Sequence, residues 1–159
     1  MHFRAAASGD LELLYFMLLE AFNWDGTERF TLDEIKADPH TELYLGGWKR
    51  AADFGVIAVE HHQPLGALWA RALPASSPGY GYVADDVPEI GMAVSTDHRG
   101  RGVGSALLDE GVERARKLGW RALSLSVEDG NIAARRLYQR NGFVVVGRNG
   151  DSDTLLREL

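Results

Sequence analysis

The stretch HRGRGVGSALLDEG, residues 98–111, decides how the rest of this chain is interpreted. It alternates three glycines with two arginines and a valine before a helix-like sequence begins: Gly100, Gly102 and Gly104 with Arg99, Arg101 and Val103. Glycine permits positive φ angles and close backbone approach, while a helix start exposes unpaired N–H groups and the positive end of the helix dipole. Together these features favour a bound anion, best a phosphate, and the two arginines add positive charge. The stretch therefore predicts a phosphate-binding loop at the start of a helix.

Other interpretations of this loop are weaker. A plain strand-to-helix turn that needs glycine explains one glycine better than three close together. A Walker loop needs Gly-Lys-Ser/Thr, which the stretch lacks, and the dinucleotide fingerprint GxGxxG or GxGxxA, counted from Gly100, ends on Ser105. That fingerprint also opens a domain of regularly alternating strands and helices, whereas this loop lies past the middle of the chain.

Hydrophobic periodicity on both sides of the loop predicts strands and helices over most of the chain. The strands are expected at residues 3–7, 54–60, 65–73, 89–94, 121–127, 143–147 and 153–159. The helices are expected at residues 10–22, 31–38, 103–118 and 131–140. Thr31 and Glu34 form a capping-box pattern, and Asp38-Pro39 should end that helix. Because hairpins alternate with strand–helix–strand units, we expect an α+β fold, a mixed sheet with helices on both faces.

Composition indicates one ordinary globular domain over residues 1–159 and excludes several classes of function. The chain has 45% hydrophobic and 25% charged residues, no cysteine and a formal net charge of −6. The lack of cysteine excludes disulfides, thiolate metal sites and a cysteine nucleophile, and the acidic balance argues against general nucleic-acid binding. The most apolar run, residues 13–19, is too short to cross a membrane, so a cytoplasmic protein is expected. His61 and His62 are adjacent and face opposite ways, so no metal site is expected.

Two motifs in and after the loop resemble a known family. Arg99, Gly102 and Gly104 meet the pattern Arg-x-x-Gly-x-Gly, and the strand EIGMAV precedes it. Downstream comes the pattern Asn-x-x-Ala-x-x-Leu-Tyr followed by Gly-Phe, formed by Asn131, Ala134, Leu137, Tyr138, Gly142 and Phe143. In this order and at this distance, the motifs resemble the two conserved blocks of the GNAT superfamily of N-acetyltransferases. One departure is Thr96, where many relatives have proline, and it concerns the rigidity of the loop.

The resemblance implies a mostly antiparallel sheet with one splayed parallel pair, strands 89–94 and 122–127, whose gap receives the pantetheine arm of acetyl-CoA. A bulge is expected to accompany the splay and to free main-chain N–H groups. Met92, Ala93 and Val94 would then offer main-chain partners to the pantetheine and the thioester carbonyl. The pyrophosphate is expected on the N–H groups of Arg99, Gly100, Arg101, Gly102, Val103, Gly104 and Ser105. The following helix would add Asn131, which also suits an N-cap, together with Ala134 and Tyr138.

Acetyl transfer to an amine needs both an acid and a base. Tyr138 would be a core residue by its helical position alone, but its place in the motif makes it the expected acid for the departing thiolate. A lysine-like acceptor is mostly cationic at neutral pH, so a base must remove a proton. Glu89 is the candidate because its face of the strand points toward the expected gap. Asp85 and Asp86 in the preceding loop, or a water relay, stay open as alternatives.

The predicted function is an acetyl-CoA-dependent N-acetyltransferase in which a primary amine attacks directly within a ternary complex. The acceptor is a small-molecule or peptide amine, with Trp24 as its expected contact and residues 74–88 as a lid. The resemblance also implies a homodimer. From charge, hydropathy and the placement of the histidines, no nucleic-acid partner, membrane partner or metal is expected. Two alternatives remain: a non-catalytic acyl-CoA-binding sensor of the same fold, and an unrelated nucleotide-binding domain.

Overall fold

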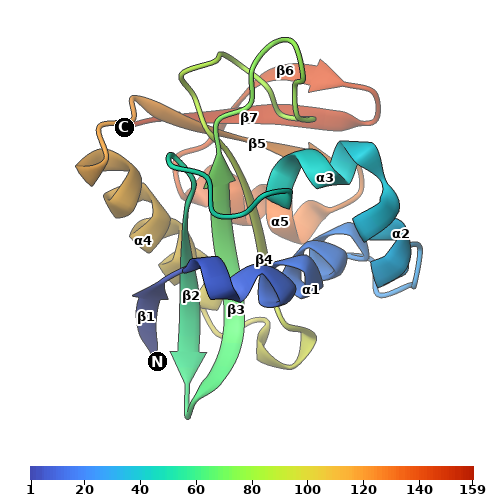
Figure 1. Ribbon diagram of the computed structural model, residues 1–159, viewed down its shortest axis with the longest axis vertical. Coiled ribbons are helices and arrows are strands. Elements are labelled where there is room, and N and C mark those ends of the chain that lie inside the picture. Colours follow the sequence, from blue (N-terminus) through green and yellow to red (C-terminus); the bar gives the residue numbers. More distant parts are fainter.

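A seven-stranded sheet in the order β1-β2-β3-β4-β5-β7-β6 forms the centre of the computed structural model, which describes residues 1–159 (Figure 1). Its strands are β1 (His2–Ala5), β2 (Phe54–Glu60), β3 (Gln63–Arg71), β4 (Glu89–Val94), β5 (Ala122–Glu128), β6 (Val144–Asn149) and β7 (Ser152–Glu158). Every neighbouring pair is antiparallel except β4 and β5, which run parallel. The predicted α+β fold with a mixed sheet is confirmed.

Helices cover both faces of this sheet. They are α1 (Leu11–Phe22), α2 (Leu32–Ala37), α3 (Pro39–Leu45), α4 (Val103–Lys117) and α5 (Ile132–Arg140), with the short 3₁₀ helices η1 (Ser8–Asp10) and η2 (Thr96–His98). On one face, α1, α2 and α3 bury a core that includes Leu14 and Trp69, and Figure 1 shows α1 crossing the strands. On the other face, α4 packs on the sheet over a core that includes Leu108 and Phe143. None of these helices has both the length and the apolar character that a membrane crossing needs.

The start of α2 follows the predicted capping box, whereas α3 was not predicted. Thr31 accepts a hydrogen bond from the Glu34 N–H at 3.2 Å, and the Glu34 carboxylate accepts one from the Thr31 N–H. Asp38-Pro39 ends α2 as expected. The same dipeptide also starts a second helix, because Pro39 tolerates the first helical position and Asp38 caps it by accepting from the His40 N–H at 2.8 Å.

The parallel pair β4 and β5 separates almost at once, as the resemblance implied. The two strands share one register pair, Glu89 with Ser124. The bulge that was expected to accompany the splay does not lie in the β3–β4 pairing, whose register runs unbroken from Gly66 opposite Val94 to Arg71 opposite Glu89. The gap opens instead because β4 stays paired with β3 while β5 pairs with β7 along its whole length.

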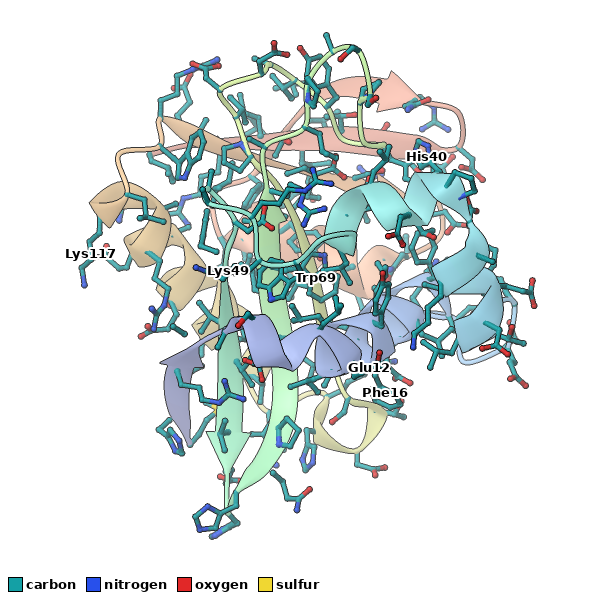
Figure 2. The ribbon with its side chains drawn as sticks, viewed as in Figure 1. Glu12, Phe16, His40, Lys49, Trp69 and Lys117 are labelled. Atoms are coloured by element: carbon teal, nitrogen blue, oxygen red, sulfur yellow. The ribbon has the colours of Figure 1, made fainter.

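Two buried side chains of β3, Trp69 and Arg71, pack on the face of the sheet that carries α1 and α3. Trp69, which Figure 2 shows behind α1, is 1% exposed, and a Cβ atom added at Gly91 would lie 2.4 Å from its ring, so only glycine fits there. Arg71 donates to both carboxylate oxygens of Asp53, at 3.0 and 2.7 Å, and to the Leu43 carbonyl of α3 at 2.9 Å. These contacts tie α3 to the sheet at the end where β4 begins.

Candidate active site

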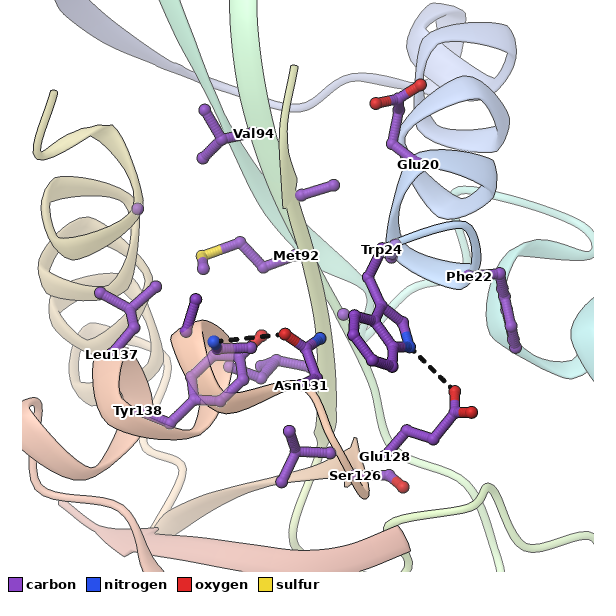
Figure 3. A pocket seen from close by; sticks show the side chains of 18 of the residues that line it. Glu20, Phe22, Trp24, Met92, Val94, Ser126, Glu128, Asn131, Leu137 and Tyr138 are labelled. Carbon is purple, nitrogen blue, oxygen red and sulfur yellow. Dashed lines mark hydrogen bonds between the residues drawn. The ribbon is translucent and has the colours of Figure 1, made fainter. Parts of the chain in front are cut away.

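A cleft of about 950 Å³ lies where β4 and β5 diverge. It extends from the first turn of α4, past α5, to the end of α1 and the segment that follows it. Figure 3 shows its walls, with Met92 and Val94 on β4, Tyr138 on α5 and Trp24 after α1. The glycine loop and the Asn-Tyr motif, which the sequence separates by some thirty residues, therefore line one cleft.

The glycine loop forms a set of free N–H groups at the α4 end of the cleft. Gly102 caps α4 with a φ angle of 80°, a left-handed conformation that favours glycine. The first N–H that bonds back within the helix is that of Ala106, to the Gly102 carbonyl at 3.1 Å. The N–H groups of Val103, Gly104 and Ser105 have no intrahelical acceptor, because they belong to the first turn. With the positive end of the helix dipole behind them, these donors fit a phosphate.

The two arginines of the loop have different roles. Arg99 lines the cleft, where its Nε donates to the Val94 carbonyl at 3.1 Å and its guanidinium lies 3.6 Å from the Glu20 carboxylate. Arg101 points elsewhere, since it donates to Glu60 of β2 at 2.9 Å and does not line the cleft. The expectation that both arginine side chains add positive charge to the phosphate-binding loop is therefore wrong for Arg101.

The backbone of β4 directs only alternate residues into the gap. The Ser124 N–H donates to the Pro88 carbonyl at 3.0 Å, so the main-chain groups of Pro88 face β5. Successive residues of a strand direct their N–H and C=O groups to opposite sides, which places those of Met92 and Val94 on the β5 side as well. There the ladder has ended, and these groups are open to the cleft, apart from the Val94 carbonyl, which accepts from Arg99 Nε. Ala93 instead directs its main chain to β3, so of the three residues predicted here only Met92 and Val94 have main-chain groups on the side of the gap.

Asn131 and Tyr138 lie on the α5 wall of the cleft. Asn131 caps α5, because its side-chain oxygen accepts from the Ala134 N–H at 3.4 Å (Figure 3). Tyr138 packs edge-on against Phe143, with ring centroids 6.0 Å apart. Burial raises the pKa of Tyr138 to about 12, so its phenol stays protonated and can act as a hydrogen-bond donor throughout the physiological range.

Glu89 lies at the opposite end of the cleft, held at both carboxylate oxygens. The Tyr44 hydroxyl donates to one oxygen at 2.7 Å, and the Gly81 N–H donates to the other at 3.1 Å. Only 5% of the residue is exposed. Burial raises the pKa of Glu89 to about 7, although both hydrogen bonds oppose that rise by favouring the ionised form. A carboxyl group with such a pKa can exchange a proton at neutral pH.

The alternative bases lie outside the cleft. Asp85 accepts from the Ala75 N–H at 2.9 Å and from the Tyr82 hydroxyl at 2.7 Å. Asp86 forms an exposed ion pair with Arg121 at 2.7 Å. Neither carboxylate lines the cleft, so the geometry favours Glu89 over both.

Trp24 borders the end of the cleft away from α4, together with Arg29 and Glu128, which, like Tyr44, sequence reasoning missed. Its indole N–H donates to Glu128 at 3.0 Å (Figure 3), and Arg29 binds both oxygens of Glu128 at 2.8 and 2.9 Å. The Arg29 guanidinium holds the pKa of Glu128 below its usual value. The sequence could have indicated Glu128, because this residue comes directly after the predicted strand 121–127, which was expected to border the gap. No such pattern marked Arg29 or Tyr44.

Charge differs between the two ends of the cleft. Around the start of α4 and along α5 the lining side chains are largely basic: His98, Arg99, Arg136 and Arg140, with Glu20 near Arg99. Around Trp24 and the β6–β7 turn they are acidic: Glu89, Glu128 and Asp151, with Arg29 already paired to Glu128. The first end suits an anion, and the second suits a cation. No group of three His, Cys, Asp or Glu side chains is arranged to hold a metal ion.

Comparison with known proteins identifies the family. A family model described as "Acetyltransferase (GNAT) family" matches residues 15–143. Mycothiol acetyltransferase from Geodermatophilus obscurus is 36% identical over 97 residues, which cover 60% of this chain and 30% of that protein. Streptothricin acetyltransferase A from Bacillus subtilis is 35% identical over 78 residues, 49% of this chain and 39% of that protein. The matched part of the chain thus spans about a third of the length of these curated relatives.

Solved structures share the fold along the whole chain. Ribosomal-protein-alanine N-acetyltransferase from Brucella melitensis superposes with a TM-score of 0.72 at 23% identity, covering 100% of both chains. PaiA N-acetyltransferase from Thermoplasma acidophilum, solved in complex with coenzyme A, gives 0.72 at 15% identity with the same coverage. With the family model matched from α1 to the end of α5, the chain belongs to the acetyltransferase (GNAT) family.

Proposed function

We propose that the chain is an acetyl-CoA-dependent N-acetyltransferase in which a primary amine attacks directly within a ternary complex. The observation that carries this proposal is the single cleft that joins a cradle of free N–H groups at α4 to the buried carboxyl of Glu89. The chain has no cysteine that could form a covalent acyl intermediate. Proximity of the two reactants in one cleft then supplies much of the rate.

The residues at the basic end fit a coenzyme A molecule. The N–H groups of Val103, Gly104 and Ser105 suit the pyrophosphate. A Cβ atom at Gly104 would come within 2.9 Å of the Leu137 side chain, so glycine suits the close approach of α4 and α5 beside these donors. Acetyl-CoA, when bound, supplies the activated acetyl thioester. The free main-chain groups of Met92 flank the gap, and one donor directed at a reacting carbonyl is worth about 3 kcal/mol in other acyl-transfer enzymes.

Glu89 is the proposed base for the acceptor amine. An amine with a pKa of about 10.4 must lose a proton before it attacks, at a cost of roughly 4–5 kcal/mol at neutral pH. Glu89, with its pKa raised to about 7, accepts that proton directly or through a water molecule. The acidic side chains at this end favour a cationic small-molecule or peptide amine, and Trp24, with the Arg29 guanidinium over its ring, is its proposed contact.

Tyr138 is the proposed donor to the departing sulfur, and its replacement by phenylalanine should slow turnover. We expect kcat to fall about tenfold, less than for many acid catalysts, because a thiolate with a pKa of about 8.5 leaves without complete protonation. The dissociation constant for coenzyme A, measured by calorimetry, should stay unchanged. Tyr82→Phe is the matched control, since the Tyr82 hydroxyl bonds Asp85 outside the cleft. An unchanged kcat in Tyr138→Phe removes Tyr138 from this role.

The experiment that tests the proposed function is release of free thiol from acetyl-CoA across a panel of amines and peptides. A rate that rises with one class of acceptor establishes acetyl transfer and names that class. If coenzyme A binds but no acceptor releases thiol, the non-catalytic sensor becomes the better description. If coenzyme A fails to bind, the assignment of the glycine loop is wrong.

A further inference from the structure

Tyr44 is a buried side chain of α3 that the proposed reaction does not yet use. Its hydroxyl donates to Glu89 at 2.7 Å and accepts from the Tyr80 N–H at 2.7 Å. The hydroxyl therefore has a defined direction, because the Tyr80 N–H can only donate. Its proton points to the carboxylate.

The segment around residues 79–81 holds the other side of the same carboxylate. The Gly81 N–H donates to the second oxygen at 3.1 Å. A Cβ atom at Gly79 would lie 2.2 Å from that oxygen and 2.9 Å from the Tyr44 hydroxyl, so this close approach requires glycine. The segment predicted as part of a lid is thus tied to the Tyr44–Glu89 pair.

No cation neutralises Glu89. Arg71 lies opposite it in the β3–β4 register, but its guanidinium is bound to Asp53 and to the Leu43 carbonyl. On β5 its register partner is the neutral Ser124. From α3 and the loop, only Tyr44 and Tyr80 bring titratable groups, and both are phenols with raised pKa values. The two hydrogen bonds are therefore what favours the ionised carboxylate against burial.

We infer that Tyr44 is a positioning residue that holds the Glu89 carboxylate in its basic form and in a fixed orientation toward the cleft. Each carboxylate oxygen accepts one hydrogen bond from the protein, so each keeps a lone pair for the acceptor proton or a bridging water. The inference rests on the proposed role of Glu89 as the base. It assigns to α3, a helix that the sequence did not predict, the task of tuning that base.

The test compares Tyr44→Phe with the wild-type chain in the pH dependence of kcat/KM. Removing a hydrogen bond that favours the charged form should shift the acidic limb upward by about one pH unit, while the rate at high pH stays close to that of the wild type. Tyr15→Phe is the matched control, because Tyr15 makes the same kind of contact to Glu42 at 3.0 Å and does not line the cleft. If kcat/KM of Tyr44→Phe falls equally at every pH and the acidic limb does not move, Tyr44 has only a structural role.

A second readout keeps the inference separate from the proposed function. The pKa of Glu89 is followed by NMR of protein labelled with ¹³C at the glutamate carboxyl carbons, with the Glu89 signal assigned by its loss in Glu89→Gln. An upward shift in Tyr44→Phe supports the inference even if no amine is acetylated, in which case only the proposed function fails. Should Tyr44→Phe not fold, fluorotyrosine at position 44 replaces it. As a more acidic phenol, fluorotyrosine should lower the same pKa, and no change would overturn the inference.

Discussion

Replacing Gly104 with glutamate is expected to abolish coenzyme A binding. Gly104 is the second residue of α4, and its N–H belongs to the free donors of the first turn. A carboxylate there occupies the cradle and repels the pyrophosphate. At a separation of about 4 Å near a protein surface, that repulsion is worth about 4 kcal/mol, or roughly a thousandfold in the dissociation constant. Calorimetric titration with coenzyme A measures the loss directly.

The fold should survive this change, so lost binding can be read as a site effect. The new Cβ would meet the Cδ2 atom of Leu137 at 2.9 Å, the far end of a flexible side chain that can shift. A negative charge in the first turn of a helix is also favourable to the helix dipole. Gly104→Gln adds similar bulk without charge, and the difference between the two variants isolates the repulsion. Undiminished affinity in Gly104→Glu contradicts the placement of the pyrophosphate on α4.

Sequence reasoning found the parts of the site that local patterns encode. Gly100 and Gly102 have positive φ angles just before α4, Gly104 lies in its first turn, and Asn131 caps α5, because φ angles and caps depend on a few neighbouring residues. The alternation of β4 also placed Glu89 on the face that carries Tyr44 and Trp69. The mixed sheet with helices on both faces followed from the same patterns, apart from α3, whereas the splayed parallel pair was expected from the family resemblance.

What sequence reasoning missed depends on contacts between distant segments. Tyr44 reaches Glu89 across 45 residues of sequence, and Trp24 reaches Glu128 across 104. In the sequence Arg101 and Arg99 look equivalent, but the Arg101 side chain turns toward Glu60 of β2, to which it donates a hydrogen bond. The absence of a bulge from the β3–β4 pairing has the same origin, because the register of β4 is set by its pairing with β3 and not by its own residues. Such partners become visible only once the sheet is assembled.

Replacing Glu89 with glutamine should lower kcat by about 10²- to 10⁴-fold, the usual contribution of a positioned base. The affinity for coenzyme A should not change, because Glu89 lies at the end of the cleft away from α4. Folding should also persist. The raised pKa of Glu89 means that the folded chain loses stability as pH rises from the ordinary carboxyl value toward about 7. The neutral amide avoids that loss, although its NH2 group then faces one of the two donors that bind the carboxylate. A melting curve at pH 8 checks this point.

The pH dependence of kcat/KM tests the role of Glu89 more sharply than the fall in kcat does. In the wild-type chain, kcat/KM should fall below about pH 7 as Glu89 takes up a proton, and this limb should vanish in Glu89→Gln. Two acceptors with different amine pKa values separate the limb of the enzyme, which stays in place, from that of the acceptor, which moves. Asp86→Asn makes the same carboxylate-to-amide change at an exposed ion pair outside the cleft, so it should keep the wild-type profile. If Asp86→Asn loses the acidic limb while Glu89→Gln keeps it, the base is Asp86 in the loop before β4, and the assignment of Glu89 is wrong.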